Sequence, residues 1–268
     1  VNSETQAGAT TGTLTFTTVA TSASNVGSYA ITGSGLTANN GNYVFAQHAN
    51  NTTALTITAL PVVLSGTRVY DGTTAAAASI LTVSNKVGSD VVTVVSGSGT
   101  LASANVGSRA ITSVGTLALG GAASGNYTVT GGSGSVAITA GTLTYVADAK
   151  TRVYGASNPA LTGTVTGFVN SETQAGATTG TLTFTTAATL ASNVGSYAIT
   201  GSGLTANNGN YVFAQHANNA MALTITALPV VLSGTRVYDG TAAVSASILT
   251  VSNTVGSDVV TVVSGSGT

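Results

Sequence analysis

The stretch VNSETQAGATTGTLTFTT at residues 1–18 returns unchanged at residues 169–186, and this repetition decides the architecture. The match continues to the end of the chain, where Thr100 aligns with Thr268, so the period is 168 residues and 100 positions overlap. Eight of those 100 positions differ. Copies this similar indicate recent duplication. Because the chain holds one full period and part of a second, we expect it to be a slice of a longer array.

A fainter repeat lies inside the period and divides it into two related modules. The same markers recur in the same order: TRVYDG at 67–72 and TRVYGA at 151–156, then NVGSRAIT at 105–112 and NVGSYAIT at 193–200. They predict module 1 (1–59, without its first strands), module 2 (60–140), module 3 (141–227) and module 4 (228–268, partial). By this division, both ends of the chain fall inside a module.

The composition is poor in charge and lacks cysteine. Only 13 of 268 residues are charged and the formal net charge is −1, whereas an ordinary soluble domain has about a quarter of its residues charged. Near-neutral chains associate with their own kind, so we expect self-association. Six scattered basic residues cannot build the positive stripe that nucleic acid requires. Glycine-rich breaks leave no run of about 20 apolar residues for a membrane-spanning helix.

The local pattern predicts strands throughout. Polar and apolar residues alternate in TLTFT at 13–17, YVF at 43–45, LTIT at 55–58, VAI at 136–138 and LTY at 143–145, which places one face of each segment on a core. Turn clusters such as ANNGN and GGSGS separate them, and no capped 3.6-residue stripe predicts a helix. We therefore predict an all-β fold of immunoglobulin-like β-sandwich modules. A continuous β-solenoid is the competing architecture, but no period of 20 to 30 residues supports it.

The joints between modules lack flexible spacers. ITA at 57–59 runs directly into LPVV, and ITA at 138–140 runs directly into GTLTY. A flexible linker needs several Gly or Ser residues at such a point, and Pro61 and Pro229 restrict one joint type further. The expected assembly is a stiff rod of modules placed end to end.

At these markers the chain resembles two families of bacterial repeat domains. Residues 141–227 resemble the MBG (mostly bacterial immunoglobulin-like) domain through VYGASNPALTGTVTGF, NVGSYAIT, NGNYVF and LTITA. Residues 60–140 resemble the YDG domain through Tyr70-Asp71-Gly72 and the closing GNYTVT. The resemblance covers the whole chain. It implies repeats of a large secreted bacterial surface protein, of the kind found in filamentous-haemagglutinin-like adhesins, with no enzymatic activity.

Two classes of function are open at this stage. In the first, the array is a structural filament, stalk or adhesin region whose work is length, stiffness and association in a biofilm or at the cell surface. In the second, the repeats bind a carbohydrate or a host or abiotic surface directly. The absence of Trp favours the first, since carbohydrate platforms present exposed aromatic side chains. A minor alternative is ice binding by the threonine row Thr13, Thr15 and Thr17, whose plain interpretation is an exposed strand.

The residues most open to a functional role are those of the TRVY segments, because Arg occupies the same position in all three copies. A guanidinium could bridge neighbouring modules or chains through paired hydrogen bonds. The plain alternatives are a solvated strand residue or an Arg packed on its own Tyr. The predicted contact residues are Arg68, Arg152, Arg236, Tyr70, Tyr154 and Tyr238.

Other candidate sites have better structural explanations. Asp71 precedes Gly72 and is typical of a turn residue, whereas calcium needs six to eight oxygen ligands, so we expect no cofactor and give calcium little weight. His48 and His216 stand alone in FAQHANN, which does not support a metal site. No Ser lies in a nucleophile motif with a nearby base. The sequence therefore predicts no catalytic site.

Overall fold

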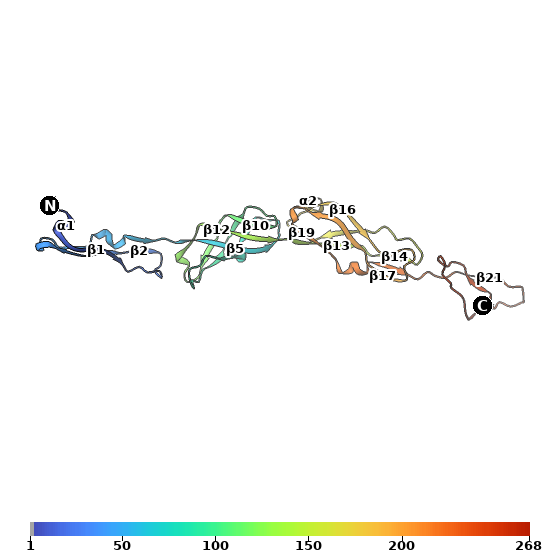
Figure 1. Cartoon of the computed structure of the whole chain (residues 1–268). Helices are drawn as coiled ribbons and strands as arrows, with labels where there is room; N and C mark the ends of the chain where they lie inside the picture. Colours follow the sequence, from blue (N-terminus) through green and yellow to red (C-terminus); the bar gives the residue numbers. More distant parts are fainter. Residues whose placement is uncertain (1–2) are drawn as a thin grey trace. The chain divides into compact units, whose positions relative to one another are not determined.

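The computed structural model describes residues 3–268 and is almost entirely β-structure (Figure 1). The chain divides into two compact units, Val1–Thr139 and Ala140–Thr268. The predicted all-β, sandwich-like fold is confirmed, with short helices added at turns. The α-helices are α1 (Gln6–Ala9) and α2 (Gln174–Ala177), and the 3₁₀ segments are Asn39–Gly41, Ala49–Thr53, Ala78–Ile80, Ser124–Asn126, Asn207–Gly209, Ala217–Met221 and Ala246–Ile248.

Module 2 contains a six-stranded sheet in the order β6-β9-β10-β12-β5-β7 and a separate pair, β11-β8. Its first and last strands pair in parallel, so β5 and β12 lie side by side through the middle of the module (Figure 1). The strands are β5 (Leu60–Val69), β6 (Ala75–Ala77), β7 (Leu81–Val83), β8 (Thr93–Ser96), β9 (Ser98–Leu101), β10 (Gly107–Ser113), β11 (Ala118–Gly120) and β12 (Tyr127–Thr139).

The alternation along β5 and β12 builds the core of module 2. Val62 and Leu64 of β5, with Val136 and Ile138 of β12, are at most 3% exposed. Because successive side chains of a strand point to opposite faces, the residues between them face solvent. Each large apolar side chain that is fully buried stabilises the fold by about 1.5–3 kcal/mol. The predicted inward face of residues 136–138 is therefore confirmed.

Module 3 follows the same plan, with its opening strands paired in parallel to its closing strands. β13 lies between β15 and β19, β14 pairs with β20, and β16 pairs with β18. Leu143 of β13 and Leu223 of β20 are completely buried. The strands are β13 (Gly141–Ala147), β14 (Lys150–Val153), β15 (Gly163–Thr166), β16 (Thr178–Thr185), β17 (Gly195–Tyr197), β18 (Thr200–Ala206), β19 (Tyr211–Gln215) and β20 (Leu223–Thr226).

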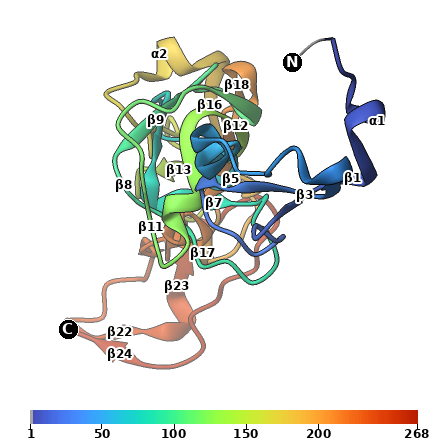
Figure 2. The same cartoon turned by 90° about the vertical axis from the view of Figure 1, so that its left-hand side faces the viewer.

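Module 1 repeats residues 169–227 and shows what that part of the fold does without the opening strands. Two ribbons form, β1 with β3 next to α1 (Figure 2) and β2 with β4, but none of its described residues is buried. Tyr43 is 37% exposed, whereas its counterpart Tyr211 is 4% exposed. The strands are β1 (Thr10–Thr18), β2 (Gly27–Tyr29), β3 (Ile31–Ala38) and β4 (Leu55–Ile57).

The strand expected at residues 43–45 does not form, and this prediction was wrong. The same letters form β19 in module 3, where β13 supplies the hydrogen-bonding partner along Gly141–Tyr145. The predicted core-facing side of residues 13–17 is likewise absent from module 1, where these residues are exposed, while Phe184 in module 3 packs against the core. The identity of the residues alone does not decide the strand; its partner does.

Module 4 forms two small antiparallel pairs, β21 with β23 and β22 with β24. Tyr238 is 93% exposed here, whereas its counterpart Tyr70 in module 2 is 6% exposed. The strands are β21 (Leu232–Gly234), β22 (Val244–Ser245), β23 (Leu249–Val251) and β24 (Ser266–Gly267). Among the described residues, no helix has the length and apolar character that crossing a membrane demands.

Candidate functional site

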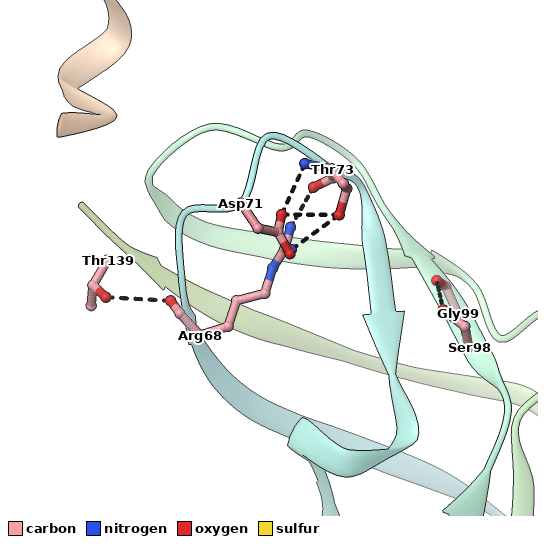
Figure 3. A network of polar contacts seen from close by, with 6 residues as sticks. All are labelled: Arg68, Asp71, Thr73, Ser98, Gly99 and Thr139. Atoms are coloured by element: carbon pink, nitrogen blue, oxygen red, sulfur yellow. Dashed lines mark hydrogen bonds and ion pairs between the residues drawn. The ribbon is translucent and has the colours of Figure 1, made fainter. Parts of the chain in front are cut away.

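The Arg of the first TRVY segment clamps the YDG turn that follows it. The Arg68 side chain is 8% exposed, and its guanidinium pairs with the Asp71 carboxylate and donates to the hydroxyl and carbonyl oxygens of Thr73 (Figure 3). The Thr73 backbone N–H and hydroxyl both donate to Asp71 Oδ1 at 2.9 Å. Asp71 therefore links Arg68, which precedes the turn, to Thr73, which follows it.

The electrostatics of this turn favour the ionised carboxylate. Burial alone would raise the pKa of Asp71, but hydrogen bonds from Thr73 and the Arg68 charge outweigh it and hold that pKa below its ordinary value. The Arg68 Nε atom is buried without a hydrogen-bond partner in the described chain. The turn is thus a tight local structure with one unsatisfied donor.

Module 4 repeats these contacts although it has no counterpart of residues 101–140 of module 2. Arg236 donates to both carboxylate oxygens of Asp239 at 2.9 and 3.0 Å, and to Thr241 Oγ1 at 2.9 Å. The Arg236 side chain is 31% exposed, compared with 8% for Arg68. Because the contacts persist without the module core, the clamp is a property of the local sequence.

Arg152 occupies the equivalent position in module 3 with different partners. It is 6% exposed and donates from Nε to Asn158 Oδ1 at 2.8 Å and from another guanidinium nitrogen to the Thr189 carbonyl. Asn158 in turn donates to the Ala188 carbonyl at 2.7 Å. The TRVYGASN segment is therefore fastened to the loop after β16 through neutral oxygen acceptors.

A second repeated hydrogen bond, from a side chain to the carbonyl four residues earlier, explains why Tyr and Arg occupy the same position in NVGSYAIT and NVGSRAIT. The hydroxyls of Tyr29 and Tyr197 donate to the carbonyls of Asn25 and Asn193, at 2.7 and 2.9 Å. Arg109 takes the same position in module 2, and its Nε donates to the carbonyl four residues earlier at 2.8 Å. Both side chains offer a long apolar stem that ends in a hydrogen-bond donor, so either closes this turn.

The FAQHANN segment makes side-chain hydrogen bonds to the backbone that the sequence analysis did not predict. Gln215 accepts from the Gly201 N–H at 2.9 Å and donates to its carbonyl at 2.7 Å, as a strand backbone would. Asn219, 3% exposed, joins Gln215 to β13 by accepting from the Ala147 N–H and donating to the Tyr145 carbonyl. The Gln-x-x-x-Asn spacing, repeated in both copies, was the available signal. His216 caps the adjacent turn, accepting from the Asn218 N–H.

Polar contacts also cross the joint between modules 1 and 2, inside the first unit. The Asn126 side chain accepts from the Val26 N–H and donates to Asn25 Oδ1, both at 2.8 Å. Beside it, the Tyr127 hydroxyl donates to Asp90 Oδ2 at 2.8 Å and accepts from the Val87 N–H at 2.7 Å. Burial, followed by the nearby Asp90 carboxylate, raises the pKa of Tyr127.

The corresponding joint between modules 3 and 4 lies inside the second unit. The Asp258 carboxylate, followed by burial, raises the pKa of the Tyr154 hydroxyl. Tyr154, Val194, Val255 and Asp258 line a cavity of about 220 Å³. Of the six predicted contact residues, Tyr154 is brought onto a neighbouring module.

The other predicted contact residues have different surroundings. The hydrogen bonds of the Arg68, Arg152 and Arg236 guanidinium groups end in their own modules, so they form no bridge between modules here, and contact with another chain stays a prediction. Tyr70 belongs to the module 2 core and Tyr238 is exposed. In residues 3–268, no three His, Asp or Glu side chains gather as a metal site would require.

The fold and these contacts define a class of protein: a tandem array of small all-β modules whose polar side chains fasten turns and joints. Family models match residues 1–135 and 143–221 of this chain. The MBG domain (YGX type) matches residues 1–53 and 143–221, and the YDG domain matches residues 51–135. These matches show tandem MBG and YDG domains in residues 1–135 and 143–221. Both are non-catalytic repeat families that occur in bacterial surface proteins. No curated protein and no solved structure matches the chain.

Proposed function

We propose that this chain is a structural repeat region of an extracellular bacterial filament, stalk or giant adhesin, with no enzymatic role, no cofactor and no nucleic-acid partner. It gives that assembly length and stiffness, and its low charge lets neighbouring copies associate. Support comes from the occurrence of MBG and YDG repeats in bacterial surface proteins. In this proposal the secreted protein lies at the cell surface.

The observation that carries the proposal is the joint between modules 1 and 2. Strand β4 ends at Ile57 and β5 begins at Leu60, so only two residues separate the last strand of module 1 from the first strand of module 2. Asn126 adds hydrogen bonds across the same joint to Asn25 and Val26. A flexible tether needs a longer Gly or Ser segment, so a joint this short and bonded supports a stiff array.

Small-angle X-ray scattering on chains extended by one, two and three further 168-residue periods tests the proposal. The maximum dimension should grow linearly, by roughly 60 to 90 Å per period for two stacked modules. A matched control inserts about 12 Gly and Ser residues between Ala59 and Leu60 and the equivalent positions, which should make the growth sublinear. Sublinear growth without the insertion would overturn the stiffness on which the proposal rests.

The competing function, direct binding of a carbohydrate or surface, is tested with the same chains on a glycan array. The most exposed aromatic side chains, Tyr238 at 93% and Phe16 at 66%, lie in modules 4 and 1. Their counterparts Tyr70 and Phe184 are buried or packed on a core in modules 2 and 3. Whole modules thus offer little aromatic surface for a sugar, and we expect no glycan to be retained. Specific retention would favour the adhesive function.

A further inference from the structure

The joint from an MBG module to the following YDG module occurs once inside each unit, and the two occurrences use the same loops. Val26, Leu60, Val87 and Asp90 line a cavity of about 270 Å³ in the first unit. Residues 168 positions later, namely Val194, Leu228, Val255 and Asp258, line the cavity in the second unit. The two cavities are therefore lined by equivalent residues of the repeat.

In the second unit, the MBG side of this site is the Tyr154–Gly155 turn. Gly155 has a φ of +80°, and a Cβ added there would lie 2.4 Å from Val255 Cγ2. Only glycine accepts both this backbone conformation and this close approach at low cost. Tyr154 and Asp258 line the same cavity, and the Asp258 carboxylate raises the pKa of the Tyr154 hydroxyl. The turn is thus shaped to its neighbour as well as to its own module.

In the first unit, the same aspartate position has a different hydroxyl partner. Tyr127, from the closing part of the YDG module, donates to Asp90 Oδ2 at 2.8 Å and accepts from the Val87 N–H at 2.7 Å. The sequence contains no residue equivalent to Tyr154 for this joint and none equivalent to Tyr127 for the other joint. Each joint therefore contains only one of the two tyrosines that the repeat places near this aspartate: Tyr127 in the first unit and Tyr154 in the second.

We propose that the MBG-to-YDG joint is a built docking site in which one aspartate accepts a tyrosyl hydroxyl from each module, while the Tyr-Gly turn of the first module packs on the Val-Gly-Ser-Asp loop of the second. A carboxylate offers two oxygens and about four acceptor positions, so both hydroxyls can bind together. The partner of the loop is thus the MBG module that precedes it in the chain. This inference rests on the joint geometry, and it deepens the proposed function by naming a contact that stiffens the array.

The site also explains why the two module types differ after their shared tyrosine. The residue after Tyr154 is Gly155, whereas the residue after Tyr70 is Asp71. Asp71 is occupied by Arg68 and Thr73 within its own turn, and its side chain would fill the space that Val255 takes beside Gly155. The docking loop therefore selects the MBG turn, which fixes the order of modules at this joint.

A disulfide test uses the absence of cysteine from the chain. A Cβ added at Gly155 would lie 3.3 Å from Val255 Cβ, close to the roughly 3.5–4.5 Å of a disulfide. Gly155→Cys with Val255→Cys in the full chain should oxidise to an intramolecular disulfide, seen by mass spectrometry of unreduced peptides. The control pair, Gly155→Cys with the exposed Val263→Cys, should not. Equal oxidation of both pairs, or none at position 255, would overturn the packing.

A milder variant guards against strain at Gly155. Tyr154→Phe should speed amide hydrogen exchange in residues 249–260 about five-fold, the effect of losing one hydrogen bond, and Asp258→Asn should add nothing in the double variant. Tyr197→Phe, which removes a hydroxyl bonded inside its own module, is the matched control and should leave this segment unchanged. Unchanged exchange in Tyr154→Phe refutes the contact.

The shared carboxylate is tested by placing a copy of residues 141–168 ahead of Val1 in the full chain. Tyr127→Phe and the Tyr→Phe change at the added copy of Tyr154 should each speed exchange at residues 87–90. If the added tyrosine has no effect there, the two-hydroxyl site is wrong. Array length measured by scattering is a separate readout, so failure of this site and failure of the proposed function can be distinguished.

Discussion

At the scale of single residues, the chain assigns its few long polar side chains to closing turns. Arg68 and Arg236 clamp YDG turns, and Arg109 closes the turn that Tyr29 and Tyr197 close in the MBG modules. The Tyr-to-Arg exchange is conservative in function because each side chain carries a donor to the same carbonyl. A turn in these modules therefore constrains the position of a donor more than the identity of the residue.

This equivalence predicts the outcome of exchanging Arg109. Arg109→Tyr should retain most of the free energy of unfolding of module 2, because the hydroxyl replaces the Nε donor. Arg109→Phe differs from Arg109→Tyr only in lacking the hydroxyl. It should lower the free energy of unfolding by about 1 kcal/mol, the net value of one hydrogen bond. Denaturant unfolding of the full chain measures both. Equal destabilisation by Tyr and Phe would show that the donor is irrelevant.

Tyr211 predicts an alkaline limit for module 3. Burial, followed by its hydrogen bond to Glu172, raises the pKa of Tyr211 to about 12. A pKa raised on folding means that the folded state favours the protonated hydroxyl. Its contribution to stability is therefore complete below the unfolded value of about 10 and is lost as the pH rises through 12.

The measurement is a titration of tyrosinate absorbance in the full chain and in Tyr211→Phe. The variant should lack one late step near pH 12 and should lose less stability between pH 10 and 12 than the parent. Tyr43→Phe removes the 37% exposed counterpart and serves as control. A Tyr211→Phe chain that keeps the late step would contradict the assignment.

At the scale of elements, the parallel pairing of opening and closing strands completes each module. β13 pairs with β19 over Gly141–Tyr145, and β14 pairs with β20. Module 1 has the sequence of β19 at residues 43–47 but forms no strand there. The closing strand therefore forms only beside the opening strand, because its backbone N–H and C=O groups need that strand as a hydrogen-bonding partner.

Supplying that neighbour should convert residues 43–47 into a strand. In the chain extended by a copy of residues 141–168 ahead of Val1, amide exchange at 43–47 should slow at least about ten-fold and Tyr43 should become buried. A control extension that carries Leu143→Asp and Tyr145→Asp in the added copy keeps the length but buries charge, and it should not protect the segment. Equal protection by both extensions would contradict strand pairing.

At the scale of the whole molecule, the sequence predicted the repeat, the all-β class and the inward faces of residues such as Leu143 and Val136. It could not predict the failed strand at residues 43–45, because pairing depends on a segment far away in the chain. It offered a bridging Arg68, a solvated one or one packed on its own Tyr, but could not show that the guanidinium turns back onto Asp71. The hydrogen bonds of Gln215 and Asn219 were missed because the repeated Gln-x-x-x-Asn spacing carries no charge and does not show which backbone groups the amides bind.

The parallel pairing described above also sets a problem of folding fidelity. β13 has two identical acceptors, YVFAQ at 43–47 and at 211–215, and the entropy of loop closure separates them by only about 0.3 kcal/mol. Two residues lie between β4 and β5, and one between β12 and β13. Folding of module 2 takes residues 60–139 out of the loop that pairing of β13 with the wrong copy would have to close. The YDG module between the two MBG modules thus makes strand exchange between them less favourable during folding.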